Sequence, residues 1–151
     1  MKSRHLAPHF PHLPALRTTL LSTLLFAATA PAFAADLIVE VEGLRSNKGN
    51  VSVGLFDKAE TFPKSFAVGQ RVPADKSVVE IVFRDLKPGS YALSAYQDEN
   101  ENQELDRGMF GIPKEPYGFS RDALGDKGPP EFRDARIELT EAGTRIRIKL
   151  R

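Results

Sequence analysis

Alternation of apolar and polar residues with a period of two is the feature that most limits how this 151-residue chain can fold. The segments 36–42, 51–56, 78–84 and 91–97 show it, and residues 135–150 repeat it twice around a central turn. Because successive side chains of a strand point to opposite sides, the pattern predicts half-buried β-strands. Six such strands predict an all-β, antiparallel β-sandwich.

The turns between these segments predict two hairpins. Asn47 and Gly49 favour a turn that joins 36–42 to 51–56, since both residue types tolerate a positive φ. Residues 141–144 would join the last two strands and place Glu138 opposite Arg147. Between 57 and 68 we expect at most one short helix, because Pro63 would end it after one or two turns.

The run from Leu86 to Tyr91 (LKPGSY) resembles the tyrosine corner of Greek-key sandwiches. In that motif the phenol donates a hydrogen bond to backbone a few residues upstream. Tyr91 is therefore predicted to be structural, and the sandwich to have Greek-key connections.

The N-terminal region has the composition of an export signal. It carries basic residues and no acidic one, then the apolar run 18–29, then Ala32 and Ala34 at the small positions of a cleavage site. The apolar run is shorter than the roughly 18–20 residues that span a bilayer, which disfavours a membrane anchor. We predict a cleaved signal at 1–34 and one β-sandwich domain at 35–151, located in the periplasm or secreted.

Removal of the predicted signal limits the chemistry of the domain. Three of the 21 basic residues and all three histidines precede residue 35, which leaves 18 basic against 20 acidic residues. The chain has no cysteine, so triads that need His or Cys are excluded from the domain, as is a lipid-modified cysteine. The last strand carries a basic stripe, but the net negative charge argues against a nucleic-acid partner. We expect a monomer with no transmembrane segment after cleavage.

The stretch from 98 to 134 is unusually long for a connection in a compact domain. Such connections are commonly binding loops or disordered linkers. Four aromatic residues favour an ordered loop, because linkers lack the apolar mass that offsets chain entropy. We therefore expect this loop to be the working surface of the protein.

Oxygen-bearing side chains recur at the start of this loop. They are Asp98, Asn100, Asn102, Glu104 and Asp106. Calcium prefers such ligands at about 2.3–2.6 Å, so Ca²⁺ could order the loop. The match to an EF-hand is incomplete, because Gln103 replaces its glycine and Met109 its bidentate carboxylate. The alternative is that Asp and Asn cap turns through bonds to backbone, and no cofactor is required.

The segment 111–120 (GIPKEPYGFS) allows two interpretations. Tyr117 and Phe119 could wall a shallow pocket for a small organic or sugar-like ligand, with Glu115 as its polar anchor. Alternatively, the two aromatic rings pack the loop onto the sandwich. A third possibility is a carboxylate-dependent hydrolase that uses a pair such as Asp106 and Glu115.

Several motifs stand in an order that resembles a known family. They are 43–49 (GLRSNKG), 53–57 (VGLFD), 86–91 (LKPGSY), 98–102 (DENEN) and 111–119 (GIPKEPYGF). Together they resemble the exported bacterial proteins grouped as domain of unknown function 2141. The resemblance implies an immunoglobulin-like or prealbumin-like sandwich, similar to transthyretin-like and carboxypeptidase-regulatory modules. It implies no established activity.

These observations favour an exported, non-catalytic β-sandwich that binds an unknown small molecule or envelope protein. The alternatives that stay open are a structural envelope protein without a ligand, and the hydrolase.

Overall fold

The computed structural model describes residues 34–151. Apart from Ala34, the predicted signal peptide therefore lies outside the described residues. Eight strands and a few short helical turns make up the described part. They are β1 (Ala35–Glu42), β2 (Asn50–Phe56), β3 (Val68–Pro73), β4 (Val78–Leu86), β5 (Gly89–Asp98), η1 (Met109–Gly111), β6 (Tyr117–Phe119), η2 (Ser120–Asp122), α1 (Phe132–Ala135), β7 (Ile137–Leu139) and β8 (Thr144–Lys149).

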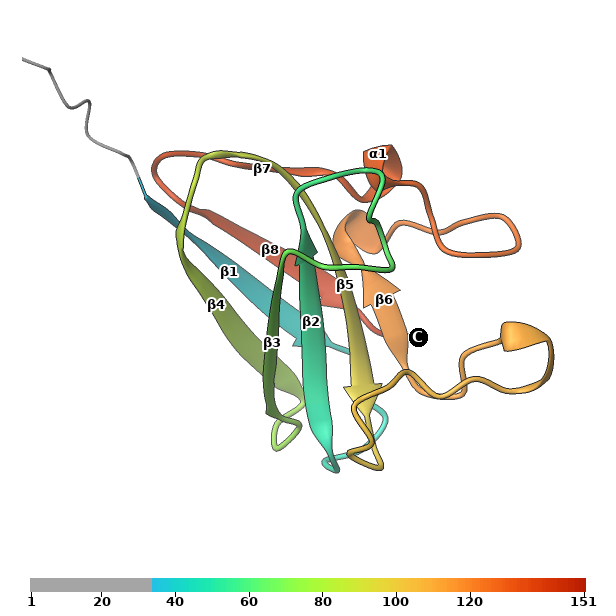
Figure 1. The fold of residues 1–151 in the computed structure, drawn as a ribbon. Helices are drawn as coiled ribbons and strands as arrows, with labels where there is room; N and C mark the ends of the chain where they lie inside the picture. The colour runs from blue at the N-terminus through green and yellow to red at the C-terminus, as the bar shows by residue number, and fades with distance from the viewer. Residues whose placement is uncertain (1–33) are drawn as a thin grey trace, which may run out of the picture. The chain divides into compact units, whose positions relative to one another are not determined.

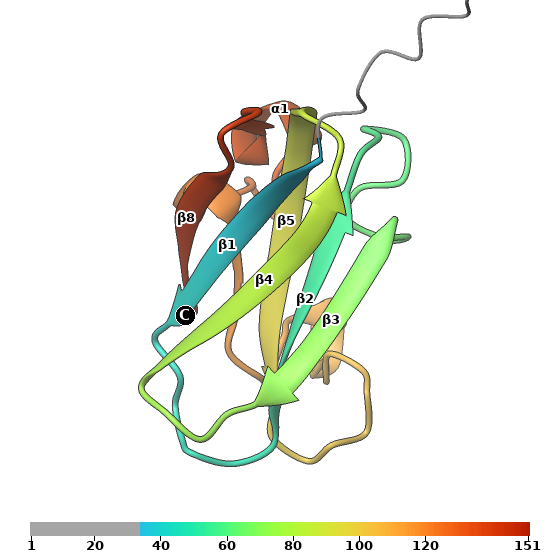
Figure 2. The same cartoon turned by 90° about the vertical axis from the view of Figure 1, so that its left-hand side faces the viewer.

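The strands form two sheets that face each other across one core. The smaller sheet has the order β4-β1-β8, and the larger has the order β3-β2-β5-β6, with β7 paired to the first residues of β5. Figure 2 shows β8, β1 and β4 in front of β5, β2 and β3, and Figure 1 shows the larger sheet from its other side. The prediction of an all-β sandwich is confirmed.

One pairing departs from the predicted antiparallel arrangement. Strands β1 and β8 run parallel, with Leu37 opposite Thr144 and Glu42 opposite Lys149. All other named pairings are antiparallel. This arrangement places strands from the two ends of the described chain side by side in the smaller sheet.

Both predicted hairpins are wrong. After β1 the chain crosses to the other sheet, where β2 pairs with β3 and β5. After β7 it crosses back, so that β7 pairs with β5 and β8 with β1. Glu138 accordingly accepts a hydrogen bond from Ser90 Oγ, at 2.7 Å, and does not oppose Arg147. The alternation identified the buried side of each strand correctly but carries no information on its partner.

Ion pairs on the outer face of the smaller sheet support the observed order. Arg145 of β8 contacts Glu40 of β1 at 2.7 Å and Glu80 of β4 at 2.8 Å. Arg147 lies 3.5 Å from the other oxygen of Glu40. Two arginines of the predicted basic stripe on the last strand are thus paired with carboxylates on the other two strands of this sheet.

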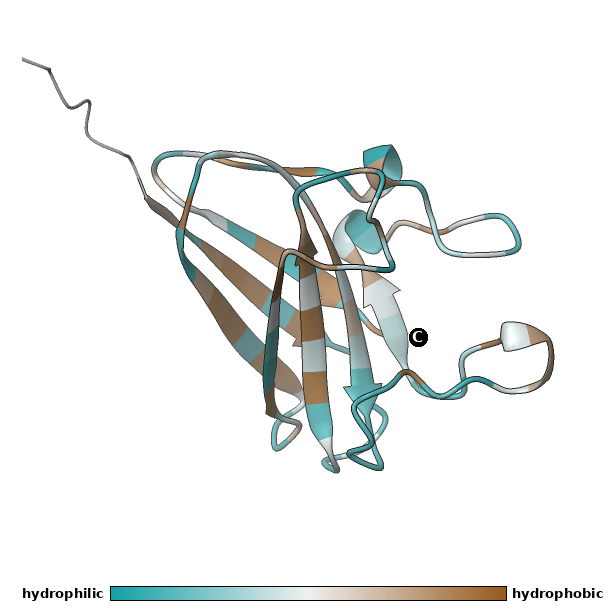
Figure 3. Ribbon diagram, in the orientation of Figure 1, coloured by the Kyte–Doolittle hydropathy of each residue, from teal (hydrophilic) through white to brown (hydrophobic). Residues whose placement is uncertain are grey.

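The core lies between the sheets and is formed by the alternating apolar residues. The smaller sheet contributes Leu37, Ile81 and Ile148, and the larger contributes Val53 and Leu93. Each of these side chains is buried. In Figure 3 brown bands alternate with teal ones along β1 and with pale ones along β2, as expected when one face of a sheet is buried.

The tyrosine corner is present. The Tyr91 hydroxyl donates a hydrogen bond to the Lys87 carbonyl at 2.8 Å. The segment 57–67, by contrast, contains turns and no helix, and the short helix α1 lies at Phe132–Ala135 instead. The long loop is also interrupted, because β6 divides the stretch after β5 into 99–116 and 120–131. No helix within 34–151 has the length and apolar character needed to cross a membrane.

Candidate functional site

The outer face of the larger sheet is built from small residues at its centre. In β2 the core residues Val51, Val53 and Leu55 alternate with Ser52 and Gly54, which therefore point away from the core. The register places Gly54 between Gly69 of β3 and Ser94 of β5. A sheet face with side chains this short leaves open space above the strands.

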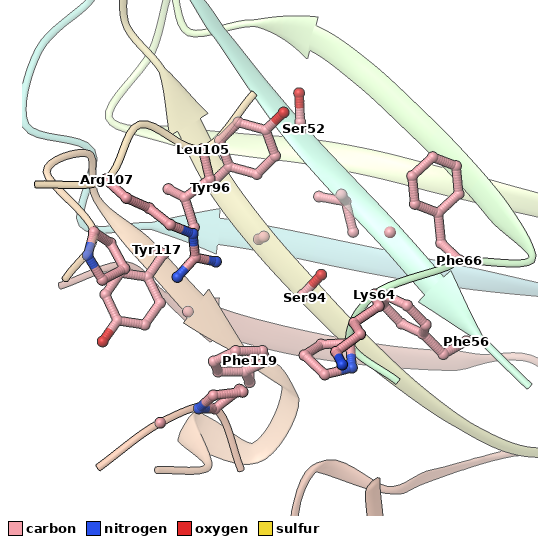
Figure 4. Close-up of a pocket in the computed structure, with 18 of the residues that line it drawn as sticks. Ser52, Phe56, Lys64, Phe66, Ser94, Tyr96, Leu105, Arg107, Tyr117 and Phe119 are labelled. Carbon is pink, nitrogen blue, oxygen red and sulfur yellow. The ribbon is translucent and has the colours of Figure 1, made fainter. Parts of the chain in front are cut away.

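That space is a groove of about 920 Å³. The sheet forms its floor, and three connections contribute to its walls: residues 63–66 before β3, 103–113 before β6, and 125–129 after η2. Figure 1 shows the last two connections as loops that extend beyond β6, and Figure 4 shows the side chains that line the groove. The predicted long loop thus supplies two walls, whereas the floor comes from strands that the sequence did not single out.

Aromatic side chains stand at both sides of the floor. Phe66 is 59% exposed and lies over the glycine pair, since a Cβ on Gly69 would come within 2.6 Å of its ring and one on Gly54 within 3.2 Å of its Cβ. The groove is lined on the other side by Tyr117 and Phe119, whose ring centroids are 6.1 Å apart. The glycines therefore allow the close approach of Phe66 to the sheet.

A cluster of aromatic rings holds one end of the groove in place. The Phe62 ring meets Phe56 at 5.0 Å, Phe119 at 5.8 Å and Phe132 at 6.0 Å, all in edge-to-face geometry. Edge-to-face pairs contribute about 0.5–1.5 kcal/mol each beyond the burial of their area. This cluster fixes the 57–67 connection and helix α1 against β2 and β6.

Charged side chains in the groove are all basic. Lys64, Arg71, Arg107 and Lys127 line it, and the lining contains no Asp or Glu. All four side chains belong to exposed residues. Figure 4 shows the Arg107 guanidinium above Tyr117, on the side that faces Ser94. The groove is therefore an electropositive surface on a domain with more acidic than basic residues.

The acidic loop after β5 is closed by hydrogen bonds to its own backbone. Asp98 is fully buried, and its two carboxylate oxygens accept the backbone N–H groups of Asn102 (3.1 Å) and Gln103 (2.8 Å). Glu101 and Gln103 adopt positive φ values of 62° and 70°. The loop thus forms a tight turn without the glycine that an EF-hand has at this point.

The remaining predicted calcium ligands bind one another or the backbone. The Asp106 carboxylate accepts bonds from the amides of Asn100 (2.8 Å) and Asn102 (3.0 Å), and the Asn102 side chain accepts the Glu104 N–H at 2.9 Å. Over residues 34–151, no three carboxylate, His or Cys side chains are grouped closely enough to hold a metal ion. The contacts correspond to the alternative of turn chemistry, and calcium binding stays a prediction.

Glu115 lies beneath this loop and is not in the groove. Its side chain is buried, and its oxygens accept the backbone N–H groups of Glu99 (2.9 Å) and Asp106 (3.0 Å). The prediction that Glu115 anchors a ligand is therefore not supported by its position. The Glu115 carboxylate instead connects the two ends of the acidic loop. Both members of the predicted acid/base pair, Asp106 and Glu115, thus take part in hydrogen bonds of the loop.

A second set of contacts attaches this loop to the connection between β1 and β2. The fully buried Gln97 donates to the carbonyls of Ser46 (2.8 Å) and Lys48 (3.0 Å). Arg45 donates to Glu99, and this hydrogen bond, together with one from Ser46 Oγ, lowers the pKa of the Glu99 carboxyl. Both loops are thereby held as one rigid edge of the domain.

Of the predicted ligand-binding residues, Tyr117 and Phe119 lie in the groove, together with Tyr96, Ser94 and Phe66 that sequence reasoning missed. A signal was present in the sequence: the middle of β2 and β5 carries Ser or Gly (Ser52, Gly54 and Ser94), and not charged residues, at positions that face away from the core. It becomes readable only once the strands are known to be neighbours.

Comparison with curated proteins and with solved structures gave no significant match. The likeness to transthyretin therefore stays a prediction. The family model described as "Uncharacterized protein conserved in bacteria (DUF2141)" matches residues 39–147, which covers every strand that frames the groove. The chain belongs to this family of uncharacterized bacterial proteins.

Proposed function

We propose that this protein is an exported, non-catalytic binding module, and that the groove on the outer face of the larger sheet is its binding site. The observation that carries the proposal is the combination of a floor of small residues with aromatic walls. Ligand pockets have volumes of about 300–1,000 Å³ and mostly apolar, aromatic linings with a few polar groups. The groove has this size and this lining.

Exposed apolar side chains on the wall support a binding role over a purely structural one. Phe110 is 93% exposed and Ile112 is 63% exposed at the tip of the connection before β6. Both residues line the groove, as does the exposed Phe66. Apolar patches of this kind on a soluble domain commonly mark interaction sites.

The supporting contacts suit a preformed site. Glu115 and the aromatic cluster around Phe62 hold connections that wall the groove. A rigid site loses less conformational entropy when it binds, which favours affinity. The absence of carboxylates from the lining favours binding over carboxylate-dependent hydrolysis at this surface.

The chain offers a sensitive test, because it contains no tryptophan. Phe66→Trp places the single tryptophan of the protein in the groove wall, where it can be excited selectively, and N-phenylnaphthylamine serves as a neutral apolar probe. We expect saturable energy transfer from the new tryptophan to the probe. The substitution Ser94→Phe, which fills the centre of the floor, should abolish this transfer, whereas Ser77→Phe, outside the groove on an exposed turn, should not. Equal transfer in both variants would contradict the proposal.

Export requires its own test. The full chain is expressed in a bacterial host, the periplasmic fraction is isolated, and the intact mass of the protein is measured. We expect a mass that corresponds to a start at Ala35 or Asp36. A full-length protein retained in the cytoplasm would overturn export while leaving the groove unaffected.

A further inference from the structure

We infer that the groove selects ligands that carry a negative charge on a flat or extended apolar body, such as an aromatic or long-chain carboxylate, sulfonate or phosphate ester. This inference rests on the proposed function, because it names the ligand class of the same site. It follows from the distribution of charge around the floor and from the shape of the space between the aromatic walls.

Four basic side chains reach the groove from four different segments. Lys64 precedes β3, Arg71 belongs to β3, and Arg107 and Lys127 lie in the connections before and after β6. Such a distribution places positive charge along both walls and not at one end. A ligand that lies along the floor would meet a cation from either side.

The two arginines keep donors available. Arg71 uses its Nε to donate to Ser52 Oγ at 3.1 Å, and Arg107 uses one terminal nitrogen to donate to the Gly111 carbonyl at 3.1 Å. A guanidinium has five N–H donors, so each retains several after these bonds. The bonds also restrict each side chain, so less entropy is lost when a carboxylate or phosphate is bound in a bidentate manner.

The opposite face of the sandwich provides an internal comparison. There Arg145 contacts Glu40 and Glu80, and Arg147 contacts Glu40 and Glu42. Arg84 contacts Asp36 in the same sheet. In the groove, by contrast, none of the four basic side chains has a carboxylate within ion-pair distance among residues 34–151. The arginines on the outer face of the smaller sheet are thus paired with carboxylates, whereas the basic side chains in the groove are available to an anionic ligand.

The space between the cations fits an apolar body. Its floor is formed by Gly54, Gly69 and Ser94, and its walls by rings such as Phe66 and Tyr117. Burial of apolar ligand surface contributes roughly 25 cal/mol per Å², whereas the basic groups fix which end of the ligand binds where. A fully hydrophilic anion would leave the rings uncovered, and a neutral hydrocarbon would leave the cations uncompensated.

The decisive experiment compares two fluorescent probes of nearly the same shape. Anilinonaphthalene sulfonate carries one negative charge, and N-phenylnaphthylamine is the neutral analogue without the sulfonate. We expect the sulfonate to bind the Phe66→Trp protein at least about tenfold more tightly, since one charge-assisted contact corresponds to roughly that factor. Its dissociation constant should rise with salt, because exposed charges are screened at an ionic strength of about 0.15 M.

Charge-removal variants assign the selectivity to the groove. Arg71→Gln and Arg107→Gln should each weaken binding of the sulfonate about tenfold more than binding of the neutral probe. The matched control Lys76→Gln removes a cation from an exposed turn outside the groove and should change neither constant. Equal weakening of both probes in the arginine variants, at an unchanged Tm, would overturn the inference, because the charge would then not distinguish the two ligands.

The outcomes separate this inference from the proposed function. If both probes bind equally, with Ser94→Phe abolishing both, then the groove binds apolar ligands and the inference fails alone. If neither probe depends on Ser94, both proposals fail. Competition by dodecanoate below its micelle concentration, but not by dodecanol, would assign the anion to a free amphiphile. Competition only by vesicles that contain phosphatidylglycerol would assign it to a lipid head group at a membrane surface.

Discussion

Glu115 Oε2 accepts a hydrogen bond from the backbone N–H of Asp106 at 3.0 Å, across the base of the acidic loop. The other oxygen of the same carboxylate accepts the N–H of Glu99, so one buried side chain closes the loop at both ends. Because the loop continues into the wall of the groove, this contact connects the stability of the domain to the shape of its candidate site.

The substitution Glu115→Gln should therefore destabilise the protein. It replaces one accepting oxygen by an NH₂ group that faces a backbone N–H, which leaves a buried donor unsatisfied. We expect the free energy of unfolding to fall by about 2 kcal/mol in urea titrations. Glu101→Gln, at an exposed position of the same loop, is the matched control and should change it by less than about 0.5 kcal/mol. Identical stability of Glu115→Gln and wild type would contradict the assigned role.

The contact between Arg45 and Glu99 predicts a specific response to acid. Hydrogen bonds from Arg45 and Ser46 lower the pKa of the Glu99 carboxyl in the folded protein relative to its ordinary value of 4.5. The ionised carboxylate therefore stabilises the fold above pH 4.5, and this contribution is lost as the pH falls from there through the lower folded pKa.

Melting curves recorded between neutral and acidic pH test this response. The Tm of the Glu99→Gln protein should lie below that of wild type at neutral pH, and the gap should close in acid. The exposed Glu104→Gln variant is the control and should follow the wild-type curve. A gap that is independent of pH would show that the ion pair is not its cause.

The tyrosine corner predicts that removal of the Tyr91 hydroxyl alone lowers the stability of the fold. Tyr91→Phe removes the hydrogen bond to the Lys87 carbonyl and retains the ring that packs against the core. We expect a decrease of about 1 kcal/mol in the free energy of unfolding. Tyr117→Phe also removes a phenolic hydroxyl, but from the groove wall, and should lower the free energy of unfolding by less. A larger loss in Tyr117→Phe than in Tyr91→Phe would contradict the structural role of Tyr91.

Calcium is not expected to be required for the fold. Both oxygens of Asp98 already accept backbone N–H groups, and Asp106 is bound by two amide side chains. The Tm should therefore be the same in EDTA, in millimolar magnesium and in millimolar calcium.

A binding metal would give a clear signal in the same assay. Saturation at a hundredfold excess over Kd adds about 2.7 kcal/mol, or on the order of 10 °C for a domain of this size. Such a rise with calcium alone, absent in Asp106→Ala, would establish the calcium site that the spacing of the loop suggested.

Much of the fold could be predicted from the sequence because the burial of one face of a strand produces a period-two pattern within that strand. The period-two pattern located β1, β2, β4 and β5, and the LKPGSY run identified the corner at Tyr91. The pairing of strands could not be predicted, because an alternating strand such as β1 fits equally well beside several partners. Its neighbours β4 and β8 are determined by contacts over long sequence separations, such as that of Glu40 with Arg145.

Only part of the candidate site could be predicted from the sequence, for the same reason. Tyr117 and Phe119 stand together in the sequence and were identified as a possible wall. Gly54, Gly69 and Ser94 become a floor only when three strands lie side by side, so no local window contains them. The same limit applies to Glu115, because its hydrogen bonds to the backbone of Glu99 and Asp106 cannot be read from the sequence around it.

The parallel pairing of β1 with β8 has a consequence for how the domain acquires its structure. Strand β1 is the central strand of the smaller sheet, and Leu37 meets its partner Thr144 only after the rest of the described chain has been made available. A chain that is still being synthesised would thus expose one whole edge of β1, with its backbone donors and acceptors free to pair with another molecule. The pairing of β1 with β8 is therefore expected to form late, since contacts of such sequence separation carry the largest loop-closure cost. A chain in which β8 is missing or delayed would keep the smaller sheet at two strands, β4 and β1, with one edge of β1 open.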